Sequence, residues 1–250
     1  MSNRNIISFD NLSLQEFDTE TDLIPLLTPE DEEEMNNEEL PNSLPILPLR
    51  NTVLFPGVVI PISAGRDKSI KLINDANAGN KIIGVVAQKN EEDEDPTKND
   101  IYTVGTVAQI LRVLKMPDGN VTFIIQGKKR FKVAEIITEE PYMNATIREI
   151  PEARPAISNK EFIAIIDSIK DLALQIIKDS PNIPSEASFA IKNIESTSFL
   201  VNFVSSNMNL SVNAGDDFVL CLVSGDKRCS LNKLKKILDV NYTNKRRREH

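Results

Sequence analysis

The hydrophobic pattern of this chain changes its period once, near residues 151–158, and this change constrains the fold more than any other feature of the sequence. Before it, short runs of β-branched residues are separated by Pro, Gly and Asn, which is typical of strands. After it, apolar residues recur at steps of three and four, as along one face of a helix. We therefore predict an α+β protein with a β-rich subdomain at 44–151, a proline-containing linker and a helical subdomain at 158–213.

The β-rich half is expected to contain seven strands and one helix. Apolar residues lie on both faces of 104–114, which favours a closed or strongly coiled sheet. The segment 116–120, Met-Pro-Asp-Gly-Asn, separates two strand-like runs and predicts a β-hairpin. A helix is expected at 66–78, ended by Gly79. The expected strands are 45–49, 58–62, 82–88, 101–116, 121–126, 130–138 and 142–150.

The helical half begins with the most periodic segment of the chain. In 158–180 the apolar residues Phe162, Ile166, Ile169 and Ala173 recur at helical spacing, and Pro181 closes the segment. Two shorter helices are expected at 185–194 and 197–206, both rich in apolar residues. Together they predict a helical bundle after the β-rich subdomain.

The negative charge of the chain is concentrated at its beginning. Residues 1–43 contain twelve Asp or Glu and one basic residue, Arg4, a net charge of −11, so the remaining residues carry +3 of the total of −8. Such a composition cannot bury enough apolar surface to offset its ordering entropy. We predict a disordered acidic N-terminal tail at 1–43, and favour a solvated spacer over an interaction motif near 23–27.

Several classes of function lack their sequence signals. The Gly127-Lys128 pair has no glycine five residues earlier, so no phosphate-binding loop is expected. The sole histidine is His250, and the two cysteines, Cys221 and Cys229, form no metal-binding pattern. The acidic run 91–95 is interpreted as a solvated loop, not a metal or glycosidase site. We expect no catalytic residues, no cofactor and no metal.

The chain also lacks the signals of membranes and nucleic acids. No stretch approaches the ~18 to 20 apolar residues of a membrane span, and the first residues lack a basic-then-apolar signal pattern. A cytoplasmic protein is expected. The basic run 245–248 has no aromatic residues beside it, so we interpret it as a solvated terminus and expect neither nucleic-acid nor membrane partners.

Five blocks of sequence carry a family resemblance. The segment 44–69, LPILPLRNTVLFPGVVIPISAGRDKS, closely resembles the opening of the Lon N-terminal domain, with its PLR strand, VLFPG turn, IPI strand and GR-acid-KS helix start. The blocks IIGVVAQK at 82–89, YTVGTVAQILRVLKMPDG at 102–119 and QGKKRFKV at 126–133 match in order and spacing, and 198–212 resembles the late helices of that domain. The resemblance covers about residues 44 to 213.

The resemblance implies a pseudo-barrel-like β subdomain followed by a helical bundle. It also implies a non-catalytic role, which is to capture unfolded or degron-bearing proteins and to help arrange a hexameric ATP-dependent serine protease. Possible partners are then such substrates, a second copy of the chain or Lon subunits. Recognition of unfolded chains needs exposed apolar surface beside polar groups. The candidate substrate-binding residues are Leu54, Phe55, Pro56, Arg66, Asp67, Lys68, Met116 and Pro117.

Three alternatives accompany this interpretation. Arg50 and Arg66 are expected to pair with carboxylates that pin loops, in preference to a substrate-binding role. A standalone Lon-domain adaptor or receptor is the alternative function, and an enzyme with its own active site is the weakest hypothesis.

After Asn213 the sequence departs from the family pattern, because 218–223 reads as a strand where a long charged helix is expected. We therefore expect 214–250 to be a divergent or truncated segment.

Overall fold

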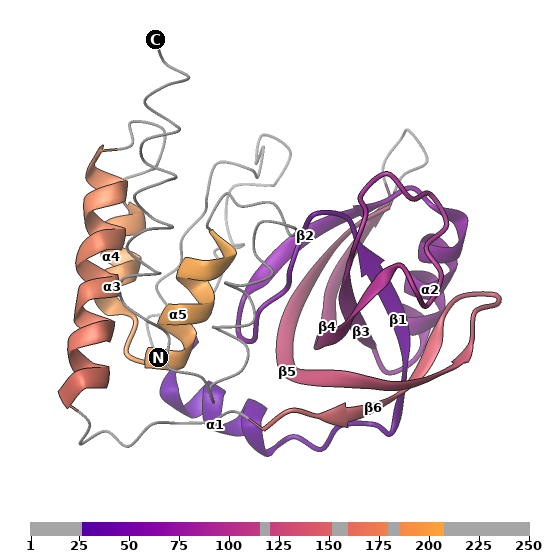
Figure 1. Ribbon diagram of the computed structural model, residues 1–250, viewed down its shortest axis with the longest axis horizontal. Helices are drawn as coiled ribbons and strands as arrows, with labels where there is room; N and C mark the ends of the chain where they lie inside the picture. The colour runs from indigo at the N-terminus through magenta and orange to yellow at the C-terminus, as the bar shows by residue number, and fades with distance from the viewer. Residues whose placement is uncertain (1–26, 116–120, 152–159, 180–185, 208–250) are drawn as a thin grey trace, which may run out of the picture.

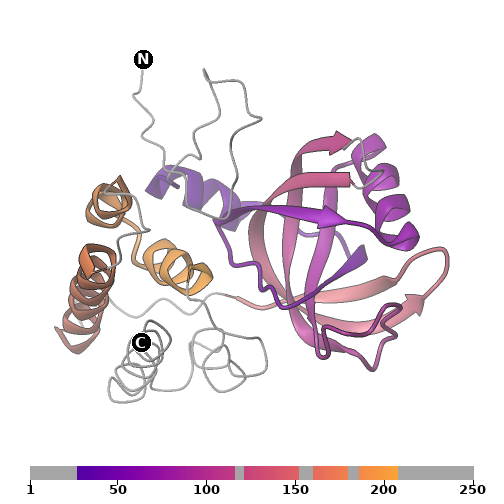
Figure 2. The same ribbon diagram turned by 90° about the horizontal axis from the view of Figure 1, so that it is seen from above.

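The computed structural model describes residues 27–115, 121–151, 160–179 and 186–207, and within them the chain forms a sheet and a group of helices (Figure 1). The α+β class is therefore confirmed. Helices α3–α5 gather on one side of the sheet, and α2 covers the end farthest from them in both views (Figure 2). The elements are α1 (Pro29–Asn37), β1 (Ser43–Leu49), β2 (Val59–Ala64), α2 (Asp67–Ala78), β3 (Ile82–Gln88), β4 (Ile101–Lys115), β5 (Val121–Thr138), β6 (Asn144–Glu149), α3 (Lys160–Asp179), α4 (Glu186–Asn193) and α5 (Thr197–Ser206).

The six strands form one mixed sheet that closes into a near-ring. Their order is β2-β5-β4-β3-β1-β6, and an additional pairing of β5 with β6 closes the ring. Strands β1 and β3 run parallel, and the other pairs are antiparallel. Helix α2 is part of the long crossover connection that a parallel pair of strands requires. The expected closed or strongly coiled sheet is thus observed as a near-ring.

The predicted hairpin is confirmed by the pairing of β4 with β5, which begins at Lys115 opposite Val121. The turn itself, 116–120, lies outside the described residues. Helix α2 also forms where the sequence predicts it, and Gly79 ends it by donating its backbone N–H to the carbonyls of Asp75 and Ala76. Both features depend on residues close together in the sequence, which is why their prediction succeeds.

The prediction of two strands at 121–126 and 130–138 was wrong, because β5 is one strand through both. Burial alternates without interruption along 121–131, so Gly127 and Lys129 lie on the inward face. Only glycine fits at position 127, because a Cβ there would overlap the backbone carbonyl of Phe55. The inward ammonium of Lys129 is 3.2 Å from the carboxylate of Glu149 on β6.

The prediction of disorder was also wrong for residues 29–37, which form α1. Thr28 and Asp31 make a capping box, in which each side chain binds the other's backbone N–H, and Pro29 occupies the first turn. Acidic residues in that turn interact favourably with the helix dipole. Met35 is 6% exposed and packs into the helical core. Residues 1–26 lie outside the described part of the chain.

The helical half and the sheet share a hydrophobic core. Residues from α3, α4 and α5 pack against Phe55 and Val58, which precede β2, and against Leu27 and Met35. The turn at 56–57 fits beneath α5, because Gly57 has a φ of +78° and a Cβ there would lie 2.8 Å from a ring carbon of Phe199. Two further clusters occupy the ring itself, one of them beneath α2.

Candidate functional site

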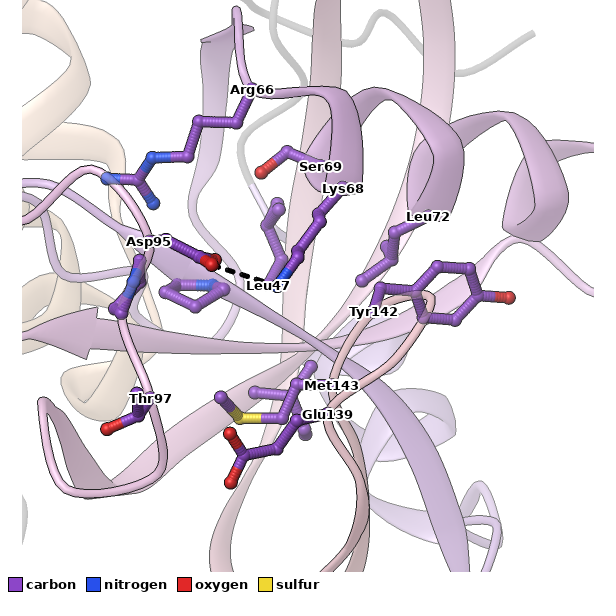
Figure 3. Close-up of a pocket in the computed structure, with 13 residues that line it drawn as sticks. Leu47, Arg66, Lys68, Ser69, Leu72, Asp95, Thr97, Glu139, Tyr142 and Met143 are labelled. Atoms are coloured by element: carbon purple, nitrogen blue, oxygen red, sulfur yellow. Dashed lines mark hydrogen bonds and ion pairs between the residues drawn. The ribbon is translucent and has the colours of Figure 1, made fainter.

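A small groove lies beside the start of α2 (Figure 3). Helix α2 itself lies on the side of the sheet away from α3–α5 (Figure 1). Three parts of the chain surround the groove, namely β1 with α2, the loop 89–100 between β3 and β4, and the turn 139–143 before β6. Its base is apolar and its rim is charged. The lining residues are Ile46, Leu47, Pro48, Arg66, Lys68, Ser69, Leu72, Asp95, Pro96, Thr97, Glu139, Tyr142 and Met143.

Lys68 crosses the mouth of this groove and joins two of its walls. It lies in the first turn of α2, and its side chain points down toward Asp95 in Figure 3. The ammonium is 2.8 Å from a carboxylate oxygen of Glu140 and 3.0 Å from one of Asp95. The hydrogen bonds to Glu140 and then Asp95 raise the pKa of Lys68. The two carboxylates thus favour the protonated form of Lys68.

Arg66 holds the loop 89–100 from its base. Its guanidinium donates to the side-chain oxygen of Gln88 at 2.8 Å and to the carbonyl of Asp93 at 3.0 Å. Gln88 is 1% exposed and donates its amide hydrogens to the carbonyls of Asn90 and Asp93 at 2.6 and 2.7 Å. The pKa of Arg66 is lowered, first by burial and then by nearby Arg50, while carboxylates of the loop act to raise it.

The expected loop-pinning role is confirmed for Arg50, whose guanidinium lies 2.9 Å from the carboxylate of Glu94. Arg66 pins the same loop, but through an amide oxygen and a backbone carbonyl, so the carboxylate partner predicted for it was wrong. The loop-pinning role of both arginines was predicted from the sequence, but the groups that they bind were not. An Arg side chain can satisfy several acceptor types, and only the folded loop decides which of them is within reach.

Of the candidate residues that the structure describes, it brings only Arg66 and Lys68 together at the groove. Leu54 and Phe55 are 3% and 4% exposed and belong to two different core clusters, and Pro56 is buried too. The three side chains therefore present no exposed apolar surface, and their role in substrate binding stays a prediction. Asp67 is exposed at the start of α2. Met116 and Pro117 lie outside the described residues.

The acidic side of the groove was not predicted from the sequence. Asp95 lies in the loop 89–100, whereas Glu139 and Glu140 lie 44 and 45 residues later in the chain, and we interpreted 91–95 only as a solvated loop. A sequence signal for this site did exist. The acidic run follows the end of β3, and the Gly-Arg-Asp-Lys segment begins α2, the helix that precedes β3, so the two segments are expected at the same end of this helix–strand pair. Tyr142 adds an aromatic ring, and burial followed by a hydrogen bond with Asp75 raises its pKa.

The described residues offer little for other chemistries. In the four described ranges, no three His, Cys, Asp or Glu side chains converge where they could hold a metal ion. None of the helices within those ranges is long and apolar enough to cross a membrane. The groove combines an apolar base with cations and anions at its rim.

Comparison with known proteins gives a family match over most of the chain. The family described as "ATP-dependent protease La (LON) substrate-binding domain" matches residues 43–215. The Lon protease of Flavobacterium johnsoniae is 73% identical over 235 residues, which is 94% of this chain and 28% of that protein. The Lon protease of Cytophaga hutchinsonii is 53% identical over 193 residues, 77% of this chain and 24% of that protein.

The chain thus spans only about a quarter of the length of these relatives. The alignment with the Flavobacterium protein extends past residue 213, into the segment that we expected to diverge. Among solved structures, the N-terminal domain of the Mycobacterium avium complex Lon protease has a TM-score of 0.56 at 20% identity. The structural match covers 78% of this chain and 95% of the Mycobacterium domain. At this identity the similarity concerns the fold alone.

Proposed function

Because this chain belongs to the family of Lon substrate-binding domains, we propose that it is a non-catalytic module that binds unfolded or degron-bearing protein segments at the groove beside α2. The observation that carries the proposal is the position of Arg66 and Lys68. The resemblance suggested these residues as substrate contacts, and both line a groove whose base is apolar.

Unfolded proteins share two features that this groove suits. They expose apolar side chains, and they expose backbone N–H and C=O groups that folded proteins have already paired. The half-buried Pro48, Pro96 and Tyr142 present apolar surface at the rim. The charged groups beside them supply donors and acceptors for a bound backbone. Contacts of this kind select for exposed chain and not for one sequence.

The groove also lies where a module can present a substrate without disturbing its own core. Helix α2, beside which it lies, is on the opposite side of the sheet from the shared core of α3–α5 (Figure 2). We propose that the helical side faces the rest of a hexameric ATP-dependent serine protease, and that the module works in the cytoplasm. Light scattering coupled to size exclusion, with and without an unfolded substrate, tests for self-association or association with Lon subunits.

The binding proposal is tested by fluorescence anisotropy with a labelled, permanently unfolded protein, such as reduced and carboxymethylated lactalbumin. Lys68→Gln removes a groove cation, and Lys71→Gln is the matched control, because Lys71 lies one turn along α2 and pairs only locally with Asp75. We expect Lys68→Gln to raise Kd about fivefold, the effect of losing one moderate contact, and Lys71→Gln to change it less than twofold.

Two outcomes would count against the proposal. Equal Kd values for the two variants would remove the groove as the binding site. Binding to folded proteins, with none to the unfolded one, would favour the alternative of an adaptor that recognises a folded partner. The purified chain should hydrolyse neither ATP nor peptides in the same preparations, and circular dichroism should show that both variants fold.

A further inference from the structure

The loop 89–100 places its own carboxylates on cations that come from separate parts of the fold. Glu94 lies 2.9 Å from Arg50, which follows β1. Asp95 lies 3.0 Å from Lys68 on α2, as the dashed line in Figure 3 shows. Arg66, between these two cations in sequence, holds the carbonyl of Asp93 at 3.0 Å. Three cations thus converge on one stretch of acidic chain.

The stem of this loop is firmly held and its acidic tip is not. At the stem, the buried side chain of Gln88 binds two backbone carbonyls of the loop. At the tip, the side chains of Glu94 and Asp95 are 81% and 70% exposed, and those of Arg50 and Lys68 are 42% and 39% exposed. Ion pairs with this exposure are weak and screened by salt. The carboxylates can therefore leave their cations while the stem stays in place.

An anion at this position stabilises the charged form of Arg66 electrostatically. Arg66 loses solvent through burial and is repelled by Arg50, and both effects disfavour its charged form. Glu94, Asp95 and Asp93 oppose them. A guanidinium stays charged under these conditions, so removing the loop carboxylates leaves the repulsion from Arg50 unopposed, while the hydrogen bonds to Gln88 and Asp93 remain. Another carboxylate-bearing segment of polypeptide would restore the lost interaction.

We propose that Arg50, Arg66 and Lys68 form a binding site for acidic segments of substrate polypeptides, and that Glu94 and Asp95 occupy this site as a built-in competitor. The inference rests on the proposed function and names the substrate class of the same groove. This competition sets a minimum number of carboxylates for binding. A segment with several carboxylates displaces the tip of the loop, whereas the contacts of an isolated carboxylate are too weak to replace the two ion pairs that it breaks.

Competition makes a quantitative prediction. The apparent affinity of a site is reduced by the fraction of molecules in which it is occupied. Two exposed ion pairs hold the tip, so removing them should tighten the binding of an acidic peptide about fivefold. The affinity of a peptide without carboxylates should stay the same. A structural role for the two acids, limited to stabilising the loop, would not produce this difference between peptides.

The test compares Glu94→Gln/Asp95→Asn with the matched control Glu91→Gln/Glu92→Gln. Glu91 and Glu92 lie in the same loop, are exposed, and make no side-chain hydrogen bond or ion pair with the described residues. Both variants raise the net charge by the same amount, so general electrostatic attraction affects them equally. The probes are two labelled peptides, one alternating Glu with Leu and the other alternating Gln with Leu, measured by anisotropy at low salt.

We expect the first variant to bind the Glu peptide about fivefold more tightly than the wild type and the control to change less than twofold. Adding Arg50→Gln to the first variant should abolish the gain. An unchanged affinity, or an equal gain in the control, would overturn the proposal while leaving the proposed function standing if the wild type binds an unfolded protein. If no variant binds either peptide or the unfolded protein, both fail.

Discussion

Asn202 joins the helical side of the molecule to the sheet, and replacing it should weaken that junction. It lies on α5, is 3% exposed, and is surrounded by both halves of the fold. Its side-chain oxygen accepts a hydrogen bond of 2.8 Å from Arg130 on β5. Its amide donates at 3.1 Å to the carbonyl of Pro56, which is 146 residues away in sequence. The side chain is therefore a two-ended polar link across the shared core.

The magnitude of the effect follows from these two bonds. Asn202→Ala leaves the buried carbonyl of Pro56 without this donor, and an unsatisfied buried polar group costs about 1 to 3 kcal/mol. The bond to a guanidinium contributes about 1.5 to 3 kcal/mol, toward the lower end here because Arg130 is only partly buried and water can replace it. Allowing for this replacement, we expect the free energy of unfolding to fall by about 3 kcal/mol.

Urea unfolding followed by far-UV circular dichroism measures this change, because the chain contains no tryptophan for fluorescence. Asn193→Ala is the matched control. Asn193 is exposed on α4, and its amide binds the carbonyl of Phe189 within the same helix, so its loss should cost less than about 0.5 kcal/mol. A decrease for Asn202→Ala no larger than that of the control would refute the reasoning that this link holds the two halves together.

Three further predictions concern other parts of the fold. Gly127→Ala forces a Cβ against the carbonyl of Phe55 and should lower the free energy of unfolding by about 1 to 3 kcal/mol in the same urea assay, and an unchanged midpoint would contradict the close approach. Thr28→Ala removes the capping box of α1 and should destabilise that helix by about 1 kcal/mol, seen as faster hydrogen exchange in α1 with β5 unchanged. Thr97 donates to Asp100 from its hydroxyl and its backbone N–H, which lowers the pKa of Asp100 below its ordinary 3.8. This contribution to stability is complete above the unfolded pKa and is lost as the pH falls through the folded one; Thr97→Ala should raise the pKa in a carboxylate NMR titration, and no change would exclude the hydroxyl as its main cause.

Elements stabilised by their own neighbours were predictable from the sequence. Helix α2 begins and ends within one residue of its predicted limits, and the helix predicted at 197–206 is observed with those limits as α5. By contrast, the break expected at Gly127 does not occur, because Lys129 is compensated by Glu149 from β6. That compensation depends on strand pairing, which no local pattern in 127–129 encodes.

The candidate site was predictable only in part. The Gly-Arg-Asp-Lys helix start drew attention to Arg66 and Lys68, and both lie at the groove. Leu54 and Phe55 were predicted to be exposed apolar residues, yet they are buried. An apolar residue beside a turn has the same local pattern whether it faces solvent or a core, and the side it faces depends on what packs over it.

The sequence by itself determined the limits of elements such as α2 and α5 and the hairpin between β4 and β5, because periodicity, caps and turn residues act over a few residues. The tertiary structure alone decided that the sheet closes, with β5 meeting β6, and that α5 covers the turn before β2. It also decided which acids reach Arg50 and Lys68. These contacts join residues tens to more than a hundred positions apart, and their partners are set only when the closed sheet and the shared core bring distant segments together.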